Sequence, residues 1–140
     1  MALKSGTMMK EHCYNSPLDV LKEYWGYDSF RTRQEEIVNA ALEDRDVLAI
    51  LPTGGGKSVC FQVPAMMREG IAIVVTPLIA LMKDQVQNLA DRGIKALCVN
   101  AGMSRREVDL TLNNAAYGDF KFLYVSPERI GTRLFRSYVQ

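Results

Sequence analysis

The residues with the clearest chemical potential lie together in I-L-P-T-G-G-G-K-S-V-C, residues 50–60. Three consecutive glycines are costly to order, because glycine loses more backbone freedom on folding than any other residue. Such a turn can, however, point successive backbone N–H groups at phosphate oxygens, and the positive end of a following helix adds to the attraction. We therefore expect a phosphate-binding loop in which Lys57 reaches the outer phosphates as the catalytic residue and the Ser58 hydroxyl binds Mg²⁺. The candidate nucleotide-binding residues of this loop are Thr53, Gly54, Gly55, Gly56, Lys57 and Ser58.

The flanking sequence supplies the strand and the helix that a phosphate-binding loop requires. Residues 46–51 (D-V-L-A-I-L) are almost wholly apolar, which predicts a strand buried on both faces, and residues 57–68 predict a helix. The usual pattern, G-x-x-x-x-G-K-[ST], begins with glycine where this chain has Leu51. The alternative is a glycine-rich turn that binds nothing and leaves Lys57 solvated, but the flanking elements favour nucleotide binding. The loop alone does not distinguish a kinase, a GTPase, a transporter ATPase and a helicase.

Strands and helices alternate along the rest of the chain, which is typical of a parallel sheet with crossover helices. The fold class is therefore predicted to be α/β, a parallel sheet with flanking helices. In the helix expected at residues 78–92, the apolar spacing turns a set of side chains inward: Leu78, Leu81, Met82, Val86 and Leu89. The other expected elements are helices at 16–25, 33–42 and 104–116, strands at 71–76, 96–99 and 122–125, and a final helical stretch after Ser126.

Composition narrows the class of protein. The 140 residues carry a formal net charge of +1, with 48% hydrophobic and 24% charged residues, as in a soluble globular domain. We expect a domain over residues 16–140 after a tail over residues 1–15, whose first residues could be a remnant of expression. Three distant cysteines (Cys13, Cys60 and Cys98) and one histidine are too few for a zinc site and predict reduced thiols in a cytoplasmic protein. No stretch reaches the roughly 20 apolar residues of a membrane-spanning helix.

Four segments, in their order and spacing, resemble the RecQ family of ATP-dependent DNA helicases. They are Y-W-G-Y-D-S-F-R-T-R-Q (residues 24–34), L-P-T-G-G-G-K-S-V-C-F-Q-V-P-A (51–65), V-V-T-P-L-I-A-L-M-K-D-Q-V (74–86) and L-Y-V-S-P-E-R-I (123–130). The resemblance implies a RecA-like P-loop NTPase domain, the first of two helicase domains, with ATP and Mg²⁺ as cofactors and DNA as partner. It also implies 3′–5′ unwinding in recombination and repair. In this superfamily a residue other than glycine is usual at the position of Leu51.

The resemblance assigns roles around the adenine base. It implies that Gln34 reads the adenine edge through two hydrogen bonds, and that Tyr27 and Arg31 flank the base. Stacking on a π-face suits both of these residue types. The alternative for Tyr27 is a core aromatic, whereas Trp25 and Phe30 are expected to pack rather than to contact the base.

The resemblance also implies a DNA-binding edge. The turns after the second and later strands would contact the phosphates of one DNA strand, as expected at the carboxyl edge of an α/β sheet. For each side chain singly, a solvated charge or a helix cap is an equally good interpretation. Arg105 and Arg106 are expected on a solvated first turn. The candidate DNA-binding residues are Thr76, Pro77, Lys83, Asn100, Ser126 and Arg129.

The chain departs from a complete helicase of this family. The family's D-E-x-H segment, which holds Mg²⁺ and positions water, is absent from the 140 residues and by family spacing would follow Gln140. We therefore expect the N-terminal, incomplete part of the first helicase domain, inactive by itself. The family's missing strands would lie centrally, so exposed strand edges predict self-association. Two alternatives remain: a non-catalytic module that binds nucleotide or single-stranded DNA, and a P-loop kinase.

Overall fold

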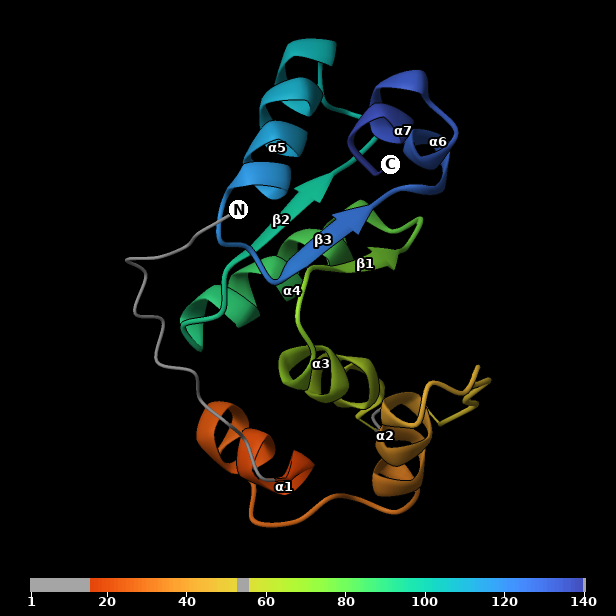
Figure 1. Ribbon diagram of the computed structural model, residues 1–140, viewed down its shortest axis with the longest axis vertical. Helices are drawn as coiled ribbons and strands as arrows, with labels where there is room; N and C mark the ends of the chain where they lie inside the picture. Colours follow the sequence, from red (N-terminus) through yellow and green to blue (C-terminus); the bar gives the residue numbers. More distant parts are fainter. Residues whose placement is uncertain (1–15, 53–55, 140) are drawn as a thin grey trace. The chain divides into compact units, whose positions relative to one another are not determined.

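The computed structural model describes residues 16–52 and 56–139 and divides the chain into two compact units, Met1–Met67 and Arg68–Gln140 (Figure 1). Each unit is described by itself. No helix among the described residues has the length and apolar character needed to cross a membrane.

The first unit is helical. Its helices are α1 (Pro17–Val20), which continues as the π-helix η1 (Leu21–Trp25), α2 (Gln34–Leu42) and α3 (Lys57–Met67). The Ser16 hydroxyl accepts a hydrogen bond from the Asp19 N–H, and Gly26 ends the helix in the left-handed conformation, as the sequence predicted. The helices close on a small core of Val20, Leu21, Val38, Val59 and Val63, with Trp25 and Phe30 packed against it.

The predicted strand at residues 46–51 is wrong. This segment forms no strand, and the side chains of Leu48 and Ile50 are 88% and 84% exposed. An apolar run becomes a buried strand only when neighbouring strands satisfy its backbone N–H and C=O groups. Among the described residues, all paired strands belong to the second unit, so residues 46–51 lack the partners that the prediction assumed.

The second unit contains the predicted parallel sheet. Its strands β1 (Ala72–Val75), β2 (Ala96–Val99) and β3 (Phe122–Val125) run in the order β1-β3-β2, so β3 is central (Figure 1). All four residues of β3 are buried, as expected for a strand covered on both faces. This is the α/β arrangement with a parallel sheet and flanking helices that the sequence predicted.

Four helices flank the sheet: α4 (Ile79–Asp91), α5 (Arg105–Tyr117), α6 (Pro127–Ile130) and α7 (Arg133–Val139). On one face, Val99, Leu123 and Val125 pack with Val108 and Leu112 of α5 and with Phe135 of α7. Helix α4 contacts β2 and β3. The predicted capping box at the start of α5 is present, with Ser104 and Glu107 each bonding the other's backbone N–H.

The predicted inward face of α4 is only partly correct. Met82 and Leu89 are buried, but Leu78 and Leu81 are 59% and 42% exposed. Helical spacing identifies an apolar face, whereas burial also requires a neighbouring element to cover each turn of that face.

Candidate nucleotide-binding and nucleic-acid-binding sites

In the first unit, Gln34 joins two segments that are distant in sequence. Its Oε1 accepts a hydrogen bond of 2.7 Å from the Arg31 N–H, and its Nε2 donates one of 3.0 Å to the Gly56 carbonyl. The Gln34 side chain is buried, with 4% of its surface exposed. The structure therefore brings together three of the predicted nucleotide-binding residues: Arg31, Gln34 and the last glycine of the loop.

The hydrogen bonds of Gln34 leave part of its amide unused. A carboxamide offers two N–H donors and two lone pairs on its oxygen, and the two protein bonds take one of each. Among the residues that the structure describes, no other group bonds this amide, so one donor and one acceptor remain. A glutamine amide with one donor and one acceptor matches the N7 acceptor and N6 donor of adenine.

Gly56 provides a steric reason for glycine in the loop. Its φ is +75°, a left-handed conformation that other residues adopt only with strain. A Cβ at this position would overlap Gln34 Nε2. Gly56 is thus required both for its backbone conformation and for the close approach of the glutamine amide.

The remaining nucleotide-binding candidates lie around these two residues in the chain. Lys57 is the first residue of α3 and is exposed, while Ser58 follows it and is half-buried. Tyr27 is 49% exposed, so the interpretation of this residue as a core aromatic is wrong. Thr53, Gly54 and Gly55 lie outside the described residues.

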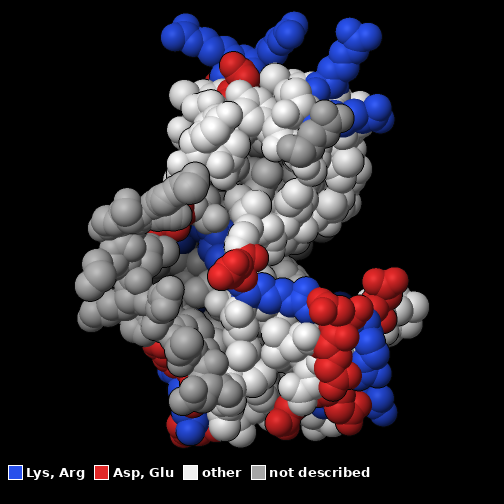
Figure 2. Space-filling view, viewed as in Figure 1, with Lys and Arg blue, Asp and Glu red and all other residues white. Residues whose placement is uncertain are grey.

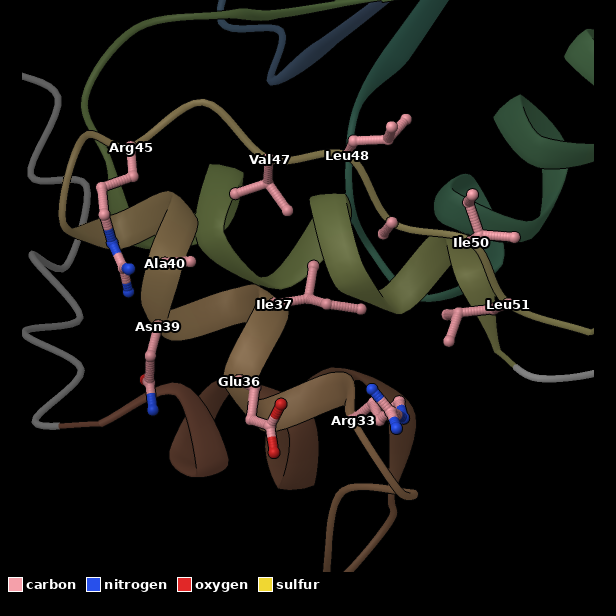
Figure 3. A pocket seen from close by; sticks show the side chains of 11 residues that line it. Arg33, Glu36, Ile37, Asn39, Ala40, Arg45, Val47, Leu48, Ile50 and Leu51 are labelled. Carbon is pink, nitrogen blue, oxygen red and sulfur yellow. The ribbon is translucent and has the colours of Figure 1, made fainter.

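A cavity of about 550 Å³ lies in the first unit between α2 and residues 45–51 (Figure 3). In this view Val47 and Leu51 point toward the helices, whereas Leu48 and Ile50 point away from them (Figure 3). The α2 side of the lining is mixed: it includes Arg33, Glu36 and Ile37. None of the nucleotide-binding candidates that the structure describes lines this cavity, so the cavity is separate from the contact between Gln34 and Gly56.

In the second unit, three DNA-binding candidates lie at one edge of the sheet. Thr76, Asn100 and Ser126 each directly follow a strand, and the parallel register aligns the last residues of the three strands. The ladder extends one step further, because Thr76 N–H donates to Val125 O over 3.1 Å and Ser126 N–H donates to Val99 O over 3.0 Å. The carboxyl edge of a parallel sheet is where α/β folds bind ligands.

Ser126 stands out at this edge. It is 2% exposed, and its hydroxyl has no hydrogen-bond partner within the part of the chain that the structure describes. A buried polar group without a partner is costly, so each one needs an explanation. The neighbouring Thr76 is satisfied differently, since its Oγ1 accepts from the Leu78 N–H over 3.4 Å.

Asn100 and Arg129 organise the loop that follows β2. Asn100 is 5% exposed, and its Oδ1 accepts a hydrogen bond of 2.9 Å from the Gly102 N–H. The guanidinium of Arg129 donates to three carbonyls of the same loop, those of Asn100, Ala101 and Met103. Sequence reasoning missed Gly102 and Met103, although N-A-G is a recognisable turn in which asparagine bonds the backbone two residues on.

Lys83 and Pro77 complete the set, and both are exposed. Lys83 lies close enough to Cys98 to act on it electrostatically. Burial raises the pKa of the Cys98 thiol, while the Lys83 charge and a hydrogen bond with the Asn100 side chain pull that pKa back down. The Lys83 charge therefore lies near Cys98 in β2, two residues before Asn100 at the carboxyl edge.

Basic side chains surround this end of the second unit. In Figure 2, Lys and Arg side chains project from the end where Figure 1 shows the start of α5 and the helices α6 and α7. The predicted exposure of Arg105 and Arg106 is confirmed. Exposed Arg133 and Arg136 from α7 add to the basic character, which suits an anionic partner.

The amino-acid sequence of the chain is similar to those of known ATP-dependent DNA helicases. The chain is 46% identical over 112 residues to the ATP-dependent DNA helicase RecQ of Synechocystis sp., covering 80% of this chain and 23% of the relative. It is also 46% identical over 118 residues to the RecQ helicase of Haemophilus influenzae, covering 84% and 19%. The chain thus spans about a fifth of the length of the curated relatives that it matches.

A solved structure shows the same fold at low sequence identity. The DUF1998 helicase MrfA, in a crystal structure described as bound to DNA, matches with a TM-score of 0.68 and 16% identity. The match covers 88% of this chain and 18% of that one, and it supports the RecA-like fold.

The family model of the DEAD/DEAH box helicases matches residues 31–139. The chain therefore belongs to the DEAD/DEAH box helicase family.

Proposed function

We propose that this chain is the ATP-binding N-terminal part of a RecQ-like DNA helicase, which couples ATP hydrolysis to 3′–5′ unwinding of duplex DNA in recombination and repair. The observation that carries the proposal is the Gln34 amide, held between Arg31 and Gly56, with one donor and one acceptor left without a partner in the described part of the chain. This arrangement couples a residue suited to adenine to the phosphate-binding loop. The identity of 46% to RecQ helicases supports the assignment.

ATP and Mg²⁺ are the proposed cofactors. Gln34 would bind the adenine, with Tyr27 and Arg31 on its two faces. Lys57 would neutralise charge on the outer phosphates, Ser58 would hold Mg²⁺, and the loop from Thr53 to Gly56 would wrap the phosphate chain. The glycine conformation at residue 56 and the position of Lys57 at the first turn of α3 fit this role. The bound metal ion would supply charge neutralisation on the phosphates.

DNA is the proposed partner of the second unit. The carboxyl edge would bind the phosphates of one strand, and the residues proposed to form this binding edge are Thr76, Pro77, Lys83, Asn100, Ser126 and Arg129. The buried Ser126 hydroxyl, unpartnered in the described structure, suits a ligand that completes its hydrogen bonding. The helicase MrfA of similar fold is described as bound to DNA, which supports the same partner here. DNA junctions would be further substrates, and the protein would work where chromosomal DNA lies, in the bacterial cytoplasm or the eukaryotic nucleus.

The intact protein that carries this chain provides the test. We expect single-stranded DNA to stimulate its ATPase, and Lys57→Ala to abolish that turnover while leaving the fold intact. Lys22→Ala, an exposed lysine of the same unit, serves as the matched control and retains activity. An ATPase indifferent to DNA, or one that survives Lys57→Ala, would refute the proposal.

The 140-residue chain alone is proposed to bind without hydrolysing, because it contains no D-E-x-H segment. In this form it would act as a non-catalytic nucleotide or single-stranded DNA binding module. Titration of labelled ATP and of a short oligonucleotide against the chain tests this proposal. Measurable ATP turnover by the chain, lost in Lys57→Ala, would contradict it.

We also propose that the isolated chain self-associates with a second copy through residues 45–51. These residues form no strand in the structure, and Leu48 and Ile50 are almost fully exposed. Sedimentation of the wild type and of Leu48→Lys tests the idea. We expect dimers or larger species that revert to monomer in the variant, and a monomeric wild type would exclude self-association.

A further inference from the structure

We propose that Arg129 is a positioning residue of the DNA-binding edge and that it does not itself contact phosphate. Its guanidinium would hold the loop 100–103 against the start of α6, so that Asn100 and Ser126 remain side by side at the carboxyl edge. The inference rests on the proposed function and specifies how one residue of that edge works.

The hydrogen bonds of Arg129 support this role. Its Nε donates to Asn100 O over 3.1 Å, and its Nη2 donates to Ala101 O over 3.3 Å and to Met103 O over 2.6 Å. A guanidinium has five N–H donors, and three of them are committed to backbone carbonyls of one loop. Arginine that binds phosphate presents two parallel N–H groups to it, and here most of that fork is turned into the protein.

The loop that Arg129 holds carries Asn100. Besides the contact of its Oδ1 with Gly102, the Asn100 N–H donates to Met103 Sδ over 3.3 Å, and the Met103 N–H donates to Asn100 O over 3.2 Å. Residues 100–103 therefore form a compact turn. Three of its carbonyl groups accept hydrogen bonds from Arg129. Sequence alone places Arg129 and Asn100 as two separate candidates, whereas the structure connects them.

Arg129 also links the segment after β3 to the segment after β2 by a hydrogen bond. The strand ladder ends where Ser126 N–H bonds Val99 O, and Arg129 crosses from the helix after β3 to the loop after β2 just beyond this bond. Charge-assisted hydrogen bonds of this kind are stronger than neutral ones. Removal of the guanidinium would let the loop move relative to Ser126, and a contact that needs both residues would weaken.

The test measures binding of the intact protein to a dT oligonucleotide by fluorescence anisotropy at several salt concentrations. A residue that contacts phosphate contributes to the slope of log K against log[salt], by about 0.7 for each single-strand phosphate. A positioning residue lowers the affinity without changing that slope. We expect Arg129→Lys and Arg129→Gln to weaken binding about tenfold, the scale of losing charged hydrogen bonds, at an unchanged slope. Lys83→Ala, which removes a proposed phosphate contact, should instead reduce the slope.

Arg129→Lys is the informative variant because it keeps the charge and loses the planar fork. In the DNA-stimulated ATPase, the DNA concentration for half-maximal stimulation should rise about tenfold while the rate at saturating DNA is retained. A residue needed only for folding would lower the rate at saturating DNA together with the amount of folded protein, which circular dichroism monitors.

A second variant perturbs the same loop without changing charge. A Cβ on Gly102 would lie 3.2 Å from Asn100 Oδ1, which forces that side chain to shift. We expect Gly102→Ala to weaken DNA binding at an unchanged salt slope, as Arg129→Lys does. Gly131→Ala is the matched control: its Cβ meets nothing within 4 Å, and its backbone is in the ordinary helical region. This control should bind like the wild type.

The possible results distinguish the positioning role of Arg129 from the DNA-binding function of the carboxyl edge. Wild-type affinity in both Arg129→Lys and Gly102→Ala would overturn the positioning role, as would a slope reduced by about 0.7 in Arg129→Gln. In those cases the DNA-binding edge itself would stand as long as Lys83→Ala lowers the slope. A wild-type protein that bound no DNA would overturn the positioning role and the proposed function together.

Discussion

The Gln34 amide donates from Nε2 to the Gly56 carbonyl over 3.0 Å, although the two residues are 22 positions apart in the chain. The contact is possible because Gly56 has no Cβ, whose place Gln34 Nε2 occupies. This hydrogen bond thus joins the first residue of α2 to the glycine-rich loop. A substitution at either Gln34 or Gly56 should therefore change the position of the other residue.

Gly56→Ala should be more destabilising than an ordinary left-handed glycine replacement. Gly26 is the matched control in the same unit, since its φ is +73° against +75° and its Cβ would meet open space. Both replacements pay about 1–2 kcal/mol for the left-handed conformation, but only Gly56→Ala also displaces Gln34. Urea titrations compare their free energies of unfolding. Equal losses in the two variants would show that the contact with Gln34 is unimportant.

Gln34→Ala should weaken ATP binding about tenfold, the scale expected when a bidentate contact to adenine is lost. Binding of GTP should change much less, because guanine presents a different edge. Titrations with fluorescent analogues of both nucleotides measure the effect, and Gln87→Ala, an exposed glutamine of α4, is the control. Parallel losses for ATP and GTP would mean that Gln34 supports the loop without reading the base.

The capping box of α5 should make stability depend on pH. Hydrogen bonds from the Ser104 backbone and side chain lower the pKa of Glu107 below its ordinary value. Since the folded-state pKa is depressed, the stabilisation is present above the unfolded-state pKa and is lost as pH falls through the folded one. Melting temperatures between about pH 3 and pH 6 should therefore fall more steeply in the wild type than in Glu107→Gln. Identical slopes would exclude the contribution.

Lys83→Met should make the Cys98 thiol less reactive. The Lys83 charge lowers the pKa of Cys98 against the larger effect of burial, so its removal raises that pKa and reduces the thiolate fraction. Alkylation by iodoacetamide at about pH 8, followed at each cysteine by mass spectrometry, should slow at Cys98. The rate at Cys60, whose pKa is raised mainly by its own burial, serves as the internal reference. Faster labelling of Cys98 in the variant would contradict the assigned proximity.

The local elements were predictable because their causes are local. Ser104 and Glu107 are three residues apart, so the capping box can be read directly from the chain, and the hydrogen bonds are present. The run F-L-Y-V predicted β3, and Gly93 lies immediately beyond the helix end at Arg92 with a φ of +80°. In each case the interacting groups lie within a few residues, so no distant segment is needed.

The errors arose where the outcome depended on distant segments. The apolar run 46–51 predicted a buried strand, but strand formation needs paired neighbours, which the described residues do not supply. Leu78 and Leu81 obey helical spacing and are nevertheless exposed, because spacing does not show which turns a neighbour covers. Tyr27 likewise gave no sequence signal that distinguished core from surface.

The sequence by itself determined the glycine-rich loop, the order of the three paired strands and the helices between them, and the residue types at the ends of those strands. Tertiary structure decided which of these groups meet: Gln34 with Gly56, and Arg129 with the loop after β2. The physical reason is the distance along the chain over which each kind of interaction acts. Propensity, capping and turn chemistry act between near neighbours in the chain, whereas these contacts join groups more than twenty residues apart, and only folding brings such groups within hydrogen-bonding distance.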